Sequence, residues 1–108
     1  MQMQIWGYPP HMLKLRDGRI LCAYSHRRDP MGIRAVLSGD GGRSWDMDNE
    51  VILRDDAVAV RGNPLGANSP SDLGYPLSVQ LADETIFTTY YFVQDDAIVH
   101  CAATKWKA

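Results

Sequence analysis

The sequence lacks long apolar runs and helical periodicity. No continuous apolar stretch reaches the roughly 18 residues that a membrane-spanning helix needs. No segment repeats apolar residues at helical spacing over three turns, so we expect an all-β chain. Residues 1–6 have neither the basic start nor the apolar core of a secretion signal. We therefore expect a soluble protein, whose compartment the sequence does not indicate.

An excess of charge of one sign is also missing. Eleven basic residues stand against 13 acidic ones, which gives a net charge of −2 at pH 7. Nucleic acid and anionic membranes attract basic surfaces, so we expect neither as a partner. The sequence contains no nucleotide-binding glycine loop, no C-x-x-C and no H-E-x-x-H. We expect no cofactor and no metal ion.

Cysteine is scarce. Cys22 and Cys101 are the two cysteines, and both fall within strand-like runs. A free cysteine in such a run usually behaves as a small buried hydrophobic residue. We expect two unpaired thiols, with a disulfide as the alternative.

The most informative segment is the octapeptide S-G-D-G-G-R-S-W at residues 38–45. Gly41 and Gly42 are suited to positive φ angles, and Asp40 can accept hydrogen bonds from backbone N–H groups across a turn. Trp45 can cover the turn with a large apolar face. The segment therefore predicts a hairpin turn.

The chain also contains an imperfect internal repeat. Residues 7–9, Gly-Tyr-Pro, recur as residues 74–76 at an offset of 67. The segment 15–20 recurs as 81–86 at an offset of 66. Repeats on this scale are typical of propellers and solenoids, in which each unit stacks on its neighbour.

The strand pattern divides the repeat into two sheets. Residues 1–54 are expected to form an N-terminal strand and a four-stranded first blade, residues 55–73 a connector, and residues 74–108 a three-stranded second blade. After the 38–45 turn, alternating Asp46, Asp48 and Glu50 suggest a solvated edge strand more than a calcium loop. The expected strands lie at 12–15, 20–26, 33–38, 51–53, 77–81, 85–93 and 98–104.

Two blades do not close a propeller, which needs about four to eight. The chain is expected to be either a part of a larger protein or a subunit that completes a ring. If Met3–Trp6 supplied the missing outer strand of the second unit, a homotrimer would have six blades.

The octapeptide resembles the Asp-box, S-x-D-x-G-x-T-W, of sialidases. Ser38, Asp40, Gly42 and Trp45 occupy its fixed positions, and Ser44 replaces the usual threonine. Nearly the whole chain resembles bacterial repeat proteins of the sialidase superfamily, through the strings G-Y-P-P-H, D-G-R-I-L, Y-S-H-R-R, G-I-R-A, L-R-D-D, D-L-G-Y-P and A-A-T-x-W. This resemblance implies a sialidase-like β-propeller built from antiparallel four-stranded blades.

The resemblance also implies a glycoside hydrolase that acts on a sialylated glycan. Tyr75 stands where such enzymes place a tyrosine nucleophile, although Pro76 replaces the serine that usually follows it. Asp72 is the candidate acid/base, by its closeness in sequence. The alternatives are a glycan-binding propeller without catalysis and an inactive structural fragment, because one fold hosts many functions.

Such enzymes hold the substrate carboxylate with arginines, whose planar forks match it. The alternative for an exposed arginine is ordinary solvated surface. Tyr8 and His11 are the first-unit counterparts of Tyr75 and Ser78, and a structural role for His11 is the alternative to a binding role. The candidate substrate-binding residues are Arg34, Arg27, Arg28, Arg61, Tyr8 and His11.

Overall fold

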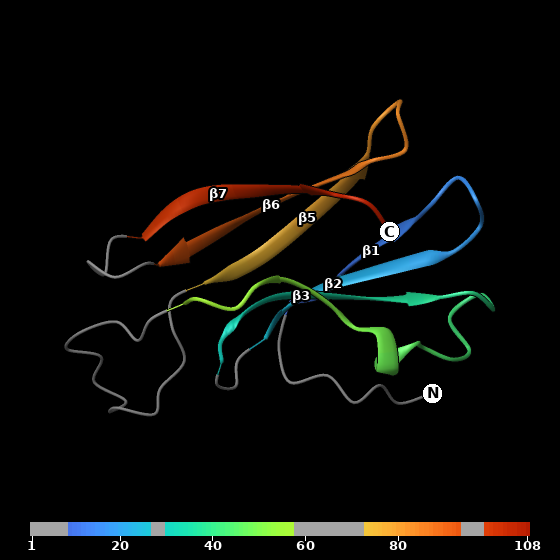
Figure 1. Cartoon of the computed structure of the whole chain (residues 1–108), viewed down its shortest axis with the longest axis horizontal. Coiled ribbons are helices and arrows are strands. Elements are labelled where there is room, and N and C mark those ends of the chain that lie inside the picture. The colour runs from blue at the N-terminus through green and yellow to red at the C-terminus, as the bar shows by residue number, and fades with distance from the viewer. Residues whose placement is uncertain (1–8, 27–29, 58–72, 94–98) are drawn as a thin grey trace.

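The computed structural model describes residues 9–26, 30–57, 73–93 and 99–108. Its seven strands form two antiparallel sheets, of four and three strands, in the orders β1-β2-β3-β4 and β5-β6-β7 (Figure 1). The all-β prediction is confirmed. The strands are β1 (His11–Lys14), β2 (Ile20–His26), β3 (Gly32–Ser38), β4 (Val51–Arg54), β5 (Gly74–Gln80), β6 (Ile86–Val93) and β7 (Val99–Trp106), and a short 3-10 helix, η1 (Met47–Asn49), precedes β4.

Helix η1 differs from the edge strand expected around residues 46–50. The side chain of Asn49 donates to the carboxylate of Asp46, which closes a compact turn in place of an extended segment. Within the described ranges, no helix is long and apolar enough to span a membrane.

The first hairpin turn, between β1 and β2, is held by backbone and carboxylate contacts. The N–H of Leu15 donates to the carbonyl of Arg19 at 2.8 Å, and the N–H of Gly18 donates to the carbonyl of Leu15 at 3.0 Å. Asp17 accepts the N–H of Arg19 at 3.0 Å. Gly18 has a φ of 94°, a conformation that favours glycine.

The turn between β5 and β6 repeats this arrangement. The N–H of Leu81 donates to the carbonyl of Thr85 at 2.8 Å, and the N–H of Glu84 donates to the carbonyl of Leu81 at 3.0 Å. Asp83 accepts the N–H of Thr85 at 3.2 Å. Glu84 takes the position of the glycine, with a φ of 70°. The sequence repeat is therefore also a structural repeat.

The pairing registers align the two sheets residue by residue. Ile20 pairs with Lys14 and Ile86 with Gln80, so the first two strands of each sheet are related by an offset of 66. The third strands are related by an offset of 68, because Ile20 pairs with Ser38 and Ile86 with Trp106. This alignment makes four pairs of residues equivalent: Leu13 with Val79, Leu21 with Phe87, Tyr24 with Tyr90, and Val36 with Thr104.

The sheets pack face to face, with β5 against β1 and β2 (Figure 1). The face of the first sheet that meets the second is here called the inner face of the first sheet. Burial of its aliphatic side chains removes apolar area from water and supplies the main stabilisation of the pair. Two clusters fill the interface, one around Leu15, Leu21, Ala23, Ala35 and Ile86, the other around Ile33, Leu73, Tyr90 and Phe92.

The opposite face of the first sheet, its outer face, carries a third cluster. Cys22, Tyr24 and Val36 are fully buried there, with Trp45 and Met47 packed against them. Trp45 is the last residue of the 38–45 turn, so the turn directs the chain back over this sheet. The first sheet therefore buries side chains on both of its faces.

The second sheet buries one face and leaves the other, here called the open face, uncovered by the described residues. Phe87 on the open face is 38% exposed, whereas its equivalent Leu21 is fully buried. Other large apolar residues exposed on this face are Tyr75, Leu77, Val79 and Val99. Cys101 is exposed as well, and no disulfide joins it to the buried Cys22. The prediction of two unpaired thiols is confirmed. Cys101 is not buried as a cysteine in a strand usually is, because it lies on the open face, where Val99 is exposed as well.

Candidate functional site

Tyr75 occupies an unusual backbone position at the start of β5. Its φ is 50°, and the preceding Gly74 has a φ of 137°. The pairing of β5 with β6 slips between Gly74 and Leu77, which marks a bulge. Pro76 lies inside the bulge and has no N–H for the ladder. Bulges re-aim side chains and are common beside active sites, and a left-handed bulky residue is a strained feature found at functional sites.

The bulge places the Tyr75 ring on the open face, where it is 67% exposed. The ring stacks on that of Tyr91, with centroids 5.6 Å apart and planes 29° apart. Stacked tyrosines give a flat apolar surface with polar edges, which suits the face of a sugar ring. Among the described residues, no hydrogen bond joins Tyr75 to a carboxylate.

His11 connects β1 to β5, the first strands of the two sheets. Its Nδ1 accepts the backbone N–H of Ser78 at 3.3 Å. The hydroxyl of Ser78 lies 2.8 Å from that of Thr88, which also accepts the indole N–H of Trp106 at 2.9 Å. By register, His11 is equivalent to Leu77, not to Ser78 as the sequence repeat suggested. His11 thus contributes to the packing of the sheets.

Arg34 lies on the outer face of the first sheet, beside Tyr24. Its guanidinium forms a 2.8 Å ion pair with Glu50, and both side chains are mostly buried. Burial raises the pKa of the Glu50 carboxyl above its ordinary value. Tyr75 is on the far face of the other sheet, so the structure does not bring Arg34 and Tyr75 together.

Arg54 is a cation that sequence reasoning missed. It ends β4, and its Nε and Nη2 donate to the two carboxylate oxygens of Asp56 at 2.7 and 2.8 Å. The guanidinium carbon lies 4.2 Å from the centre of the Phe92 ring. The contact with Asp56 raises the pKa of Arg54. Because Phe92 is near the end of β6, Arg54 lies at the same end of the sheets as Tyr75. The signal in the sequence that could have identified Arg54 as a candidate was its position at the end of an expected strand.

The 38–45 turn is built as its residues predict. Ser38 Oγ donates to Asp40 at 2.8 Å and accepts the N–H of Gly42 at 2.9 Å. Asp40 accepts the N–H of Ser44 at 2.9 Å and the hydroxyl of Ser44. Gly41 and Gly42 have φ angles of 77° and 91°.

The hydrogen bonds of the turn also tune Asp40. Those from Ser44, followed by that from Ser38, lower the pKa of the Asp40 carboxyl to about 2. The turn follows β3, whereas Tyr75 is the second residue of β5 and lies at the other end of the sheets. The turn therefore supports the hairpin and is distant from the Tyr75 site.

Several predicted site residues lie outside the described ranges, so their predictions stay untested. They are Tyr8, Arg27, Arg28, Arg61 and Asp72.

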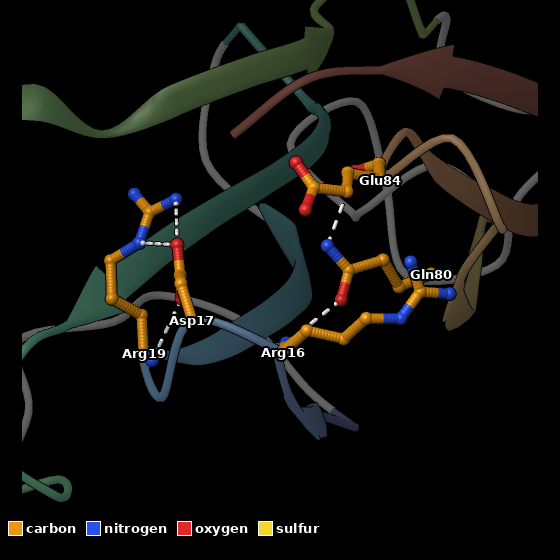
Figure 2. A network of polar contacts seen from close by, with 5 residues as sticks. All are labelled: Arg16, Asp17, Arg19, Gln80 and Glu84. Atoms are coloured by element: carbon orange, nitrogen blue, oxygen red, sulfur yellow. Dashed lines mark hydrogen bonds and ion pairs between the residues drawn. The ribbon is translucent and has the colours of Figure 1, made fainter.

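A pocket of about 150 Å³ lies between the two hairpin turns, at the end away from Tyr75. Gln80 bridges the sheets there: its Oε1 accepts the N–H of Arg16 at 2.9 Å, and its Nε2 donates to the carbonyl of Glu84 at 3.2 Å (Figure 2). Asp17 and Arg19 line the pocket and pair with each other. The polar groups of Gln80, Asp17 and Arg19 in its lining are therefore already paired with protein groups. In the described part of the chain, no three His, Cys, Asp or Glu side chains are grouped as a metal site.

No protein-family model matches this chain, and no curated protein does. Among solved structures, the chain is similar to a protein from Dyadobacter fermentans that is described as having unknown function, at a TM-score of 0.75 and 32% sequence identity. The match covers 99% of this chain and 26% of that one, so this chain spans about a quarter of that protein's length. The two share a fold over this quarter, and the similarity assigns no activity to either.

Proposed function

We propose that this chain forms nearly two blades of a sialidase-like β-propeller, and that the assembled propeller is a glycoside hydrolase. The observation that carries the activity is Tyr75, a strained and exposed tyrosine on a bulge at the start of β5. A tyrosine nucleophile suits a sugar whose anomeric carbon already bears a carboxylate, because a neutral phenol avoids charge repulsion.

Head-to-tail stacking of equivalent sheets supports the propeller. The first sheet packs its inner face on the second, and the second sheet leaves the equivalent face open. Repetition of one such contact around an axis closes a ring of about four to eight blades. A protein about four times as long as this chain, like the Dyadobacter fermentans protein, has room for about six or seven such blades.

Two routes complete the ring. Copies of this chain can assemble as a homotrimer with six blades, or further blades of a longer protein can supply the rest. In either case, the substrate is a glycan bound at the end that carries Tyr75. Asp72 is the proposed acid/base, and Arg27, Arg28 and Arg61 are the proposed partners of the substrate carboxylate.

Turnover of fluorogenic sialosides by the assembled protein tests this activity. Tyr75→Phe removes the nucleophilic oxygen and keeps the ring that stacks on Tyr91, so kcat should fall by about a thousandfold or more. Tyr91→Phe is the matched control and should keep kcat within about threefold. Absence of turnover by the assembled wild type, or equal rates for Tyr75→Phe and wild type, would contradict the proposal.

Glycan binding without hydrolysis is the second candidate, and the Tyr75–Tyr91 stack favours it. Under this function, Tyr75→Phe binds a glycan array as the wild type does, whereas Tyr75→Ala loses about tenfold or more in affinity because the stacking surface is gone. A wild type that binds no glycan, forms no defined oligomer and aggregates would instead indicate an inactive structural fragment.

A further inference from the structure

The open face of the second sheet is an unpartnered apolar surface. Leu77 and Val79 project from β5 and Phe87 from β6, and Val99 extends the surface onto β7. Contiguous apolar surfaces of this kind mark interaction sites in soluble proteins. The structure itself indicates what covers such a face.

The first sheet shows the same face in its covered state. Leu13 and Leu21, the equivalents of Val79 and Phe87, pack in the cluster that includes Ile86 of the second sheet. The surface that covers Leu13 and Leu21 is thus the buried face of the second sheet, formed by β6 and its neighbours β5 and β7. In the first sheet, the side equivalent to that covering surface is the outer face.

The outer face of the first sheet is also apolar at its margins. Met12 on β1 is 53% exposed, and Ile52 on β4 is exposed to a similar extent. Trp45 and Met47 lie between these margins over the buried centre. We propose that the open face of one copy docks on the outer face of the first sheet of a second copy, over Trp45 and Met47 and against the exposed Met12. The two copies then follow the same head-to-tail order as the two sheets within one chain. This inference rests on the proposed propeller for the closure of the ring, and on the internal interface for its contacts.

The internal interface predicts one contact in particular. Within the chain, His11 on β1 accepts the backbone N–H of Ser78 on β5. By register, Leu77 is the equivalent of His11, and Met12 is the equivalent of Ser78. Leu77 of one copy therefore lies beside Met12 of the next. The contact is heterologous, so it builds a ring and not a symmetric pair.

Cysteine cross-linking tests this contact in the full chain. The background variant is Cys101→Ser; the remaining Cys22 is fully buried, and burial raises the pKa of its thiol to about 11, which keeps it unreactive. Met12→Cys combined with Leu77→Cys should give covalent dimers and larger oligomers under mild oxidation. Leu77→Cys combined with Gly39→Cys, which lies at the other end of the sheets, is the matched control and should stay monomeric on a denaturing gel. Equal cross-linking of both pairs, or dimers from Leu77→Cys alone, would overturn the head-to-tail contact.

The mass in solution gives a second, independent measurement. Phe87→Lys places a charge in the centre of the docking surface and should raise the dissociation constant of the oligomer by about 100-fold or more. Ala82→Lys adds the same charge on an exposed turn and should leave the dissociation constant unchanged within about threefold. A well-folded wild-type monomer at high micromolar concentration, with Cys101 freely labelled, would overturn the inference. Cross-linked rings that cleave no sialoside would support the contact between copies and contradict only the proposed activity. Sialoside turnover by a monomer would support the activity and contradict the contact between copies.

Discussion

The hydroxyl of Tyr90 lies 2.7 Å from Oγ1 of Thr104, whereas the equivalent Tyr24 has Val36 in the place of that threonine. The hydroxyl of Tyr24 is buried and has no hydrogen-bond partner among the described residues. A buried hydroxyl without a partner costs free energy that a paired one does not. The hydroxyl of Tyr24 therefore contributes less to the free energy of unfolding than the hydroxyl of Tyr90 does.

Val36→Thr should stabilise the protein, because the new hydroxyl can pair with Tyr24 as Thr104 pairs with Tyr90. We expect a gain of about 1 kcal/mol in the free energy of unfolding, measured by urea denaturation. Thr104→Val is the reciprocal change and should cost about 1 to 3 kcal/mol, since it leaves the Tyr90 hydroxyl unpaired. Two changes of the same sign would contradict the equivalence of these positions.

Gly18 and Glu84 occupy equivalent positions with positive φ in the two hairpin turns, so reciprocal substitutions there should change the free energy of unfolding in opposite directions. Gly18→Ala should destabilise the protein by about 1 to 2 kcal/mol, because alanine disfavours the positive φ of this position; no neighbouring atom adds to this cost. Glu84→Gly relieves the same strain in the second turn, and the flexibility of glycine in the unfolded chain offsets part of the gain, which leaves about 0.5 kcal/mol. Thermal unfolding measures both, and a destabilising Glu84→Gly would show that the side chain of Glu84 matters more than its backbone.

Gly32 is required by a close approach of two strands. A Cβ at this position would overlap the backbone carbonyl of Arg54 at the end of β4. Gly32→Ala must therefore displace backbone, and we expect a loss of about 3 kcal/mol or the detachment of β4. Gly39→Ala is the control, because nothing surrounds that position. Hydrogen exchange of the β4 amides would locate the damage, and unchanged protection in Gly32→Ala would contradict the prediction.

Asp40 makes the 38–45 turn sensitive to acid. Its pKa is about 2 in the folded protein, against an ordinary value of 3.8, so the charged form is favoured by folding. This contribution to stability is complete above about pH 4 and is lost as the pH falls from 4 towards 2. Because Ser44 is the main cause, Ser44→Ala should raise the pKa of Asp40 towards 3.8. Carboxyl chemical shifts recorded against pH measure both values, and a midpoint near 3.8 in the wild type would refute the assigned hydrogen bonds.

Local patterns predicted the strands well. Strand β2 (Ile20–His26) has the predicted bounds, and β3 (Gly32–Ser38) begins one residue earlier than predicted. The turns were also predictable, because aspartate and glycine act on neighbouring backbone groups within a few residues. Because these interactions join residues only a few positions apart, the residues that form a turn stand together in the sequence and identify it.

Contacts between distant segments were not predictable in the same way. The pairing of Arg34 with Glu50 depends on where β4 returns, and the exposure of Cys101 depends on which face of the second sheet stays open. The alternation of residues along β7 is the same whether or not another sheet covers them. The position of Arg54 over Phe92 likewise follows from the packing of the two sheets.

Strand β7 (Val99–Trp106) is paired on one side, with β6, in the part of the chain that the structure describes. Backbone groups along an unpaired side can accept a strand from any other chain. Newly synthesised copies are therefore most vulnerable to aggregation while this edge of the sheet is accessible to other chains. Dilution should favour recovery of the native protein, and crowding of incompletely folded chains should favour fibrous deposits.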